Sequence, residues 1–138
     1  MDRKDIEKLA ESKLFILYII DRIKMPISNT RLTELALEVK EIDYLYIQQY
    51  LSDLVSAGYL KCEIHDDRRM YTITPAGKEV LGYFKHLILY SLRERIDRMI
   101  SAKRPDIYNE SKVFSDYMPL NENEYIVRCR ALEGEIPL

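Results

Sequence analysis

The sequence predicts a mainly α-helical fold of the α+β class, and three observations support this prediction. Apolar residues recur every three or four positions over long stretches, as they do on the buried face of a helix. Two short segments, residues 59–64 and 70–74, instead alternate between apolar and polar side chains, as strands do. Finally, 47% of the 138 residues are hydrophobic, which suits one domain, or a small domain with an appendage.

The first helix is expected over residues 5–23, ending before Met25-Pro26. It contains the longest apolar run of the chain, LFILYII at residues 14–20. A membrane span needs about 20 apolar residues. The run therefore indicates a helix that is buried on several sides within the protein.

Two shorter helices are expected next. The second should stop near Lys40, and three residues are able to cap its start: Ser28, Asn29 or Thr30. Asp43 is the expected cap of the third helix, which should end at Ala57-Gly58. Apolar residues recur along it at steps of three and four: Tyr44, Ile47, Leu51, Leu54 and Val55.

The two alternating segments are expected to pair as a hairpin with the polar residues 65–69 (HDDRR) at its tip. Directly afterwards, Thr74 is a suitable helix cap, and Pro75 suits the first helical position, where no N–H is needed. We expect this helix to run without a break to about Lys103. One apolar stripe would cover the core, whereas a second stripe needs another partner: Tyr83, Leu87 and Tyr90.

The last part of the chain predicts a second β-hairpin. Residues 113–118 precede a turn-like stretch at 119–123, and residues 125–132 alternate again. A lone hairpin is marginal in water, so it should pack on the long helix, on a partner subunit or on strands that this chain lacks. We therefore divide the chain into a first domain at 1–75, a long helix at 76–104 and a hairpin extension, which a longer natural chain would complete, at 105–138.

Charge and motif content narrow the possible functions. The net charge is −2 and evenly spread, whereas nucleic-acid binders usually show a basic excess on at least one face. Cys62 and Cys129 match no zinc spacing, and no catalytic triad, phosphate-binding glycine loop or dinucleotide fingerprint is visible. We therefore expect no enzyme, metal or cofactor. Without a signal peptide or membrane span, the expected location is the cytoplasm.

The order of the elements resembles a winged helix-turn-helix domain. LxxLxxxGYL at residues 51–60, followed by DDRRMYTITPAG at 66–77, is similar to the recognition helix, wing and following helix of MarR-like and PadR-like transcriptional regulators. LAESKLFILYII and YLYIQQYLSDLVSAGYL also resemble a bacterial winged-helix family known only as a domain of unknown function. The resemblance implies a DNA-binding transcriptional regulator that acts as a homodimer.

Applied to this sequence, the resemblance places the third helix in the major groove of double-stranded DNA and the hairpin at the backbone or minor groove. Gln side chains read adenine, and Tyr and Ser reach phosphates. The expected DNA contacts are Arg31, Lys40, Tyr44, Tyr46, Gln48, Gln49, Ser52, Arg68 and Arg69. The expected dimer interface is Tyr83, Leu87 and Tyr90. No residue pattern identifies a small-molecule effector.

The third helix departs from the family pattern, because residues 41–58 contain no Lys or Arg and do contain acids that repel phosphates. Much of any DNA affinity would therefore come from Arg68 and Arg69. For these arginines, the alternative is pairing with Asp66 and Asp67. For Gln48 and Gln49, the alternative is a role as ordinary residues of the helix surface. The tyrosines are equally compatible with a ligand cavity lined by Tyr83, Tyr90 and Tyr117. The whole domain has the alternative of a protein–protein interaction module that does not bind DNA.

Overall fold

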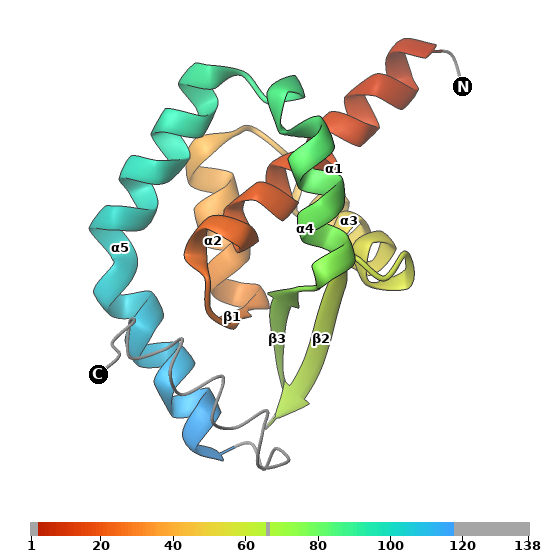
Figure 1. Cartoon of the computed structure of the whole chain (residues 1–138). Helices are drawn as coiled ribbons and strands as arrows, with labels where there is room; N and C mark the ends of the chain where they lie inside the picture. The colour runs from red at the N-terminus through yellow and green to blue at the C-terminus, as the bar shows by residue number, and fades with distance from the viewer. Residues whose placement is uncertain (1–2, 66, 118–138) are drawn as a thin grey trace.

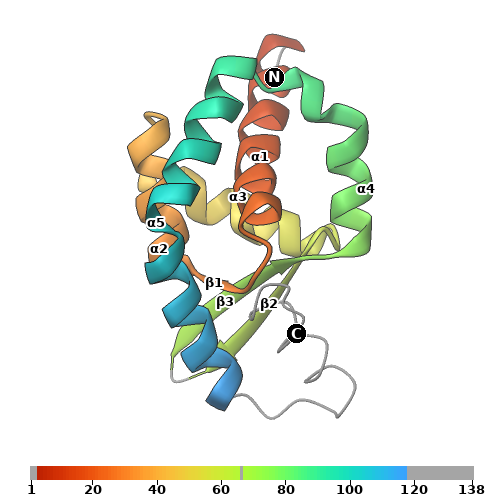
Figure 2. The same cartoon turned by 60° about the vertical axis from the view of Figure 1, so that its left-hand side comes forward.

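The protein is described by a computed structural model over residues 3–65 and 67–117. It is mainly helical with a small antiparallel sheet, so the predicted α+β class is confirmed. Figures 1 and 2 show α1 in the middle, with α2 and α5 on one side and α4 on the other. The elements are α1 (Arg3–Ile23), β1 (Ile27–Ser28), α2 (Asn29–Val39), α3 (Tyr44–Ser56), β2 (Leu60–His65), β3 (Arg68–Ile73), α4 (Pro75–Phe84), the 3-10 helix η1 (Lys85–Leu87) and α5 (Tyr90–Tyr117).

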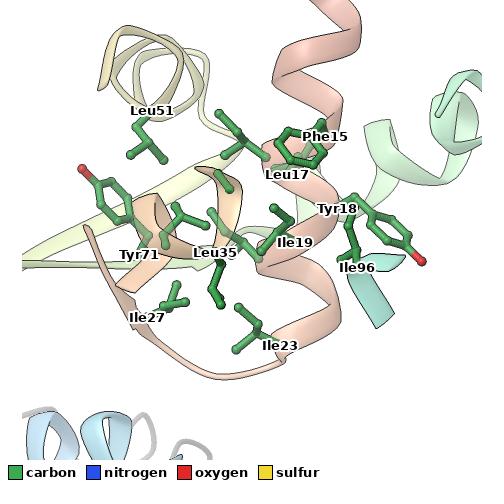
Figure 3. Packing of buried hydrophobic residues seen from close by; sticks show 14 of the residues in the cluster. Phe15, Leu17, Tyr18, Ile19, Ile23, Ile27, Leu35, Leu51, Tyr71 and Ile96 are labelled. Carbon is green, nitrogen blue, oxygen red and sulfur yellow. The ribbon is translucent and has the colours of Figure 1, made fainter. Parts of the chain in front are cut away.

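Helix α1 forms the centre of the core, as its apolar run predicted. All side chains from Leu14 to Ile20 are buried, and the helix packs against α2, α3, α4, α5 and β3. In Figure 3, Ile19 and Ile23 face α2 and β1, whereas Tyr18 lies beside Ile96 of α5. The run is therefore enclosed by the other elements.

The predicted helix caps are confirmed for α2, α3 and α4. Among the candidates for α2, the cap is Ser28, whose hydroxyl oxygen accepts the N–H of Arg31 at 3.1 Å. A carboxylate oxygen of Asp43 accepts the N–H of Leu45 at 2.8 Å at the start of α3. The cap of α4 is Thr74, with Pro75 at the first helical position. These caps satisfy N–H groups that a helix start leaves without partners.

The sheet has the strand order β1-β3-β2. Pairing in the β2–β3 hairpin runs from Leu60 opposite Ile73 to His65 opposite Arg68, so the strands extend further towards the tip than predicted and include His65, Arg68 and Arg69. Asp67 has a φ of 62°, a left-handed conformation that Asp tolerates in tight turns. Strand β1 was not predicted, because two residues are too few to show an alternating pattern.

The prediction of a single long helix over residues 76–104 is wrong, because the chain forms α4, η1 and α5 instead. The break lies at Ile88, which is extended (φ −86°, ψ 127°) and only 1% exposed. The side chain of Arg93 stabilises the break, since its Nε donates to the Ile88 carbonyl oxygen at 3.1 Å. The turn sends α5 back along α1 and α2 (Figure 1), so that Leu81 and Ile96 are both buried although they lie on different helices.

The predicted hairpin at 105–138 is also wrong where the structure describes it, because α5 continues to Tyr117. Pro105 lies inside this helix, although it lacks the N–H of a regular helical bond. Burial of Ile107 (1% exposed) and Ser111 (0%) anchors the helix beyond the proline. The rest of the expected hairpin, 118–138, lies outside the described residues, and the division into three domains stays a prediction.

Helix α4 docks closely on the start of the hairpin through Gly77. The N–H of Thr74 donates to the Tyr59 carbonyl oxygen at 3.1 Å, and a Cβ atom at Gly77 would collide with that same oxygen. Gly82 lies in the same helix, but a Cβ atom there would meet nothing within 4 Å. The two glycines therefore offer a matched test of the docking.

We expect Gly77→Ala to lower the free energy of unfolding by about 1–3 kcal/mol, because the helix would have to move away from the hairpin. Gly82→Ala should raise the same quantity by up to about 1 kcal/mol, because alanine favours a helix. Urea unfolding followed by circular dichroism measures both. Equal effects of the two substitutions would contradict the close approach at Gly77.

Candidate functional site

A hollow of about 360 Å³ opens where α2, α3, the β2–β3 hairpin and α5 meet. Several of the expected DNA contacts line it, namely Tyr44, Gln48, Arg68 and Arg69. The remaining walls are Ser28, Asn29 and Thr30 at the start of α2, Asp67 at the hairpin tip and Glu110 of α5. The fold thus brings the start of α2, the start of α3 and the hairpin arginines to one place.

Helix α3 presents its polar and tyrosine-rich side to solvent, and this side includes Tyr44, which the spacing had grouped with the apolar residues. Ile47, Leu51 and Leu54 are buried. The side chains expected to contact DNA on this helix are exposed with the exception of Gln48: Tyr44, Tyr46, Gln49 and Ser52. Leu45 is 73% exposed, an apolar feature that the sequence reading did not single out.

Gln48 is half-buried in a closed ring of hydrogen bonds between α2 and α3. Its Nε2 donates to Thr33 Oγ1 at 3.1 Å, and its Oε1 accepts from Asn29 Nδ2 at 2.7 Å. Thr33 Oγ1 closes the ring by donating to Asn29 Oδ1 at 3.2 Å. Because both amide atoms are engaged, Gln48 is not an ordinary surface residue in this conformation, and its contact with DNA stays a prediction. Its role here is to fix α3 against α2.

Tyr71 of β3 extends this ring to the sheet. Its hydroxyl oxygen accepts a hydrogen bond from Asn29 Nδ2 at 3.2 Å. Burial raises the pKa of Tyr71 above its ordinary value, so the hydroxyl stays protonated at neutral pH. One amide group therefore holds α3 and the hairpin strand in a fixed relation to the start of α2.

Gln49 is exposed and donates from Nε2 to an Asp53 carboxylate oxygen at 2.9 Å. Lys13 of α1 lies 3.1 Å from the other oxygen of the same carboxylate. The hydrogen bonds from Gln49 and from Lys13 hold the pKa of Asp53 below its ordinary value. The lysine also offsets part of the negative charge that Asp53 brings to α3.

The expected basic contacts differ in their surroundings. Arg31 Nη1 lies 3.4 Å from a Glu34 oxygen on the same helix, and the Lys40 ammonium lies 5.5 Å from the centre of the Phe15 ring. Arg69 is exposed beside the hollow.

Arg68 is half-exposed, and the structure pairs it with α5. Arg68 Nη2 lies 3.5 Å from a Glu110 oxygen, a partner that neither reading of the arginine named. The alternative, pairing with Asp66 and Asp67, stays a prediction, because Asp66 lies outside the described residues. Glu110 also accepts a hydrogen bond from the Ser28 hydroxyl at 2.9 Å. Sequence reasoning missed Glu110, because Ser28 lies 82 positions away and residues 105–138 were expected to form a hairpin.

The three residues expected at a dimer interface cluster where α4 gives way to α5. Tyr83, Leu87 and Tyr90 are 69%, 50% and 66% exposed, and Phe84 and Leu89 beside them are 47% and 67% exposed. We call these five residues the apolar corner. Phe84 and Leu87 also line an apolar hollow of about 290 Å³ between α1, α3 and α4, whereas Tyr83 and Tyr90 do not. The side chain of Tyr117, proposed for a ligand cavity, lies outside the described residues.

Three further findings concern metal sites, membrane spans and the thiol of Cys62. Among the side chains that the structure describes, no three His, Cys, Asp or Glu residues are grouped as metal ligands. Over residues 3–65 and 67–117, no helix is both long and apolar enough to cross a bilayer. Cys62 is a free thiol whose pKa is raised by burial.

We expect Gln48→Ala to lower the free energy of unfolding by about 1–3 kcal/mol, because it leaves Asn29 and Thr33 with missing partners in a partly buried place. The neighbouring Gln49→Ala is the control and should change it by less than about 0.5 kcal/mol, since that side chain is exposed. Chemical denaturation measures both. A negligible cost for Gln48→Ala would show that the ring does not hold α2 and α3 together.

Comparisons with known proteins give a family and one solved structure. No curated protein matches the chain. The chain is similar to the crystal structure of Sso10a-2, a DNA-binding protein from Sulfolobus solfataricus, with 25% sequence identity and a TM-score of 0.40 over 79% of this chain and 97% of that one. A family model described as a domain of unknown function, DUF4364, matches residues 12–138. Because this match spans most of its length, the chain belongs to the DUF4364 family.

Proposed function

We propose that the chain is a transcriptional regulator of the winged helix-turn-helix type that binds double-stranded DNA as a homodimer. Helix α3 would be the recognition helix, and the β2–β3 hairpin would be the wing. The observation that carries this proposal is the hollow where the starts of α2 and α3 meet Arg68 and Arg69. A phosphate backbone entering there would meet groups from all three elements.

The exposed residues divide into base-reading and phosphate-binding groups. Gln49 and Ser52 lie on the exposed side of α3 and have the hydrogen-bonding groups that read base edges. Tyr44 and Tyr46 are exposed near the start of α3 and suit phosphate contacts. The start of α2 also favours phosphate, because a helix N-terminus carries partial positive charge and free N–H groups.

The basic residues supply the remaining backbone contacts. Arg31 and Lys40 lie on and directly after α2, and Arg68 and Arg69 lie on the wing. Arg69 borders the hollow and is exposed, so it is the wing residue best placed for a phosphate or the minor groove. Because α3 carries no Lys or Arg, these four side chains would account for most of the salt dependence of binding.

We expect Arg69→Ala to weaken binding to random-sequence duplex DNA by roughly tenfold, because a charged hydrogen bond to phosphate is lost. The slope of log affinity against log salt should fall by about 1. Arg95→Ala removes the same charge from an exposed position of α5 and is the control. Fluorescence anisotropy over a salt series measures both, and equal effects of the two substitutions would contradict a role of the wing.

The apolar corner is the proposed dimer interface, because exposed aromatic and aliphatic side chains gathered in one place favour association. We expect light scattering to show a dimer for the wild type. Leu87→Glu should raise the dissociation constant of the dimer at least about tenfold, since a charge would be buried against the partner subunit. Leu37→Glu, at an apolar position of α2 that is 46% exposed, is the control and should leave the dimer intact. A monomeric wild type would contradict this interface.

One observation favours the alternative, a protein-interaction module on the same scaffold. Tyr44, Leu45 and Tyr46 are three consecutive exposed residues with large apolar parts, and no basic residue accompanies them on α3. A protein partner would bury Leu45, whereas DNA offers it little beyond a thymine methyl group. If the wild type binds no duplex DNA even at low salt, the module is the better reading.

A further inference from the structure

We propose that Glu110 of α5 is a built-in competitor that occupies Arg68 and the start of α2 in place of a DNA phosphate. This inference rests on the proposed function, because it concerns the same hollow. In this role, the Glu110 carboxylate is an internal anion that sets how tightly the site binds phosphate. The reason lies in the chemistry of the two groups, since a carboxylate and a phosphate oxygen seek the same hydrogen-bond donors.

The contacts of Glu110 are those that an incoming phosphate would need. One carboxylate oxygen accepts the hydroxyl hydrogen of Ser28 at 2.9 Å, and the other lies 3.5 Å from Arg68 Nη2. Ser28 is also the cap of α2, so Glu110 brings negative charge to the positive end of that helix. Glu110 lines the hollow together with Arg68 and Arg69.

The position of Glu110 is set by the core. Its neighbours on α5, Ile107 and Ser111, are 1% and 0% exposed, and α5 packs on β1 and α2. The Glu110 side chain is 15% exposed, whereas Arg68 is 51% exposed. The carboxylate is therefore held in place, and Arg68 is the partner that is free to turn towards solvent. In Figures 1 and 2, the later part of α5 descends beside the hairpin tip, which is consistent with this contact.

The negative charge of Glu110 has a direct consequence for DNA binding. A DNA phosphate that binds Arg68 must first separate the arginine from Glu110. It must then approach the Glu110 carboxylate, which remains in the hollow. Both effects lower affinity without changing which bases are read. Removing the charge while keeping the shape should therefore tighten binding to every duplex sequence alike.

The test compares Glu110→Gln with Glu94→Gln in the full chain, using labelled random-sequence duplex DNA at low and moderate salt. Glu110→Gln keeps the side-chain length and an oxygen that accepts from Ser28. Glu94→Gln makes the same change of charge at an exposed position near the other end of α5, about 24 Å away along the helix. Each substitution is repeated in an Arg68→Ala background, and thermal unfolding confirms that every variant is folded. Glu110→Ala is the second variant, in case Glu110→Gln does not fold.

We expect Glu110→Gln to tighten binding about fivefold, the size expected for releasing one solvent-accessible ion pair, and Glu94→Gln to change it little. The gain should disappear in the Arg68→Ala background. An equal gain for both glutamate substitutions, or a gain that persists without Arg68, overturns the inference. If the wild type binds and Glu110→Gln binds no more tightly, only the inference fails. If no variant binds at low salt, both the inference and the proposed DNA binding fail.

Discussion

Burial of the α1 segment from Leu14 to Ile20 is the constraint on which the rest of the structure depends. Fully burying one large apolar side chain contributes about 1.5–3 kcal/mol, so a helix with buried residues on several sides has to be enclosed by other elements. Helices α2, α3, α4 and α5 and strand β3 all pack against it. Helix α1 therefore supports both the proposed recognition helix and the wing. The position of each is fixed by its packing on α1 as well as by its contact with the other.

Polar contacts decide the direction in which these elements pack. On one side of α1, the Tyr18 hydroxyl donates to Asp97 at 3.1 Å, and Arg22 Nε donates to the same oxygen at 3.0 Å. Burial and then Asp97 raise the pKa of Tyr18 to about 12. Because the folded state holds this proton more tightly, the contribution to stability is present below the ordinary pKa and is lost as pH rises towards 12. The hydrogen bonds from Tyr18 and Arg22 to Asp97 thus hold the first half of α5 against α1. They do so independently of Glu110, which lies in the second half of α5.

The sequence predicted those parts of the fold whose signals are local. Helices α1 to α3 and the hairpin were predictable, because each has its own periodicity and its own boundary signal, such as Met25-Pro26 after α1, Asp43 before α3 or the polar tip of the hairpin. The break at Ile88 was not, since no glycine or proline marks it and the apolar stripes continue on both sides. The continuation of α5 past Pro105 was not predictable either, because it depends on the burial of Ile107 and Ser111 in the folded protein. The engagement of Gln48 and of Glu110 depends on distant residues, and a spacing pattern carries no information about such partners.

Scarcity of available positive charge links dimerisation to DNA binding in the proposed function. Affinity for duplex DNA falls with salt by a slope of about 0.9 for each phosphate neutralised, so the number of phosphate contacts decides what survives at physiological salt. Two of the four expected basic contacts are paired with acids within one protomer, namely Arg31 with Glu34 and Arg68 with Glu110. Joining two such modules raises apparent affinity by about 10²- to 10⁴-fold without any new contact. A monomer would then bind DNA only weakly, and the apolar corner would be as necessary for operator binding as the wing itself.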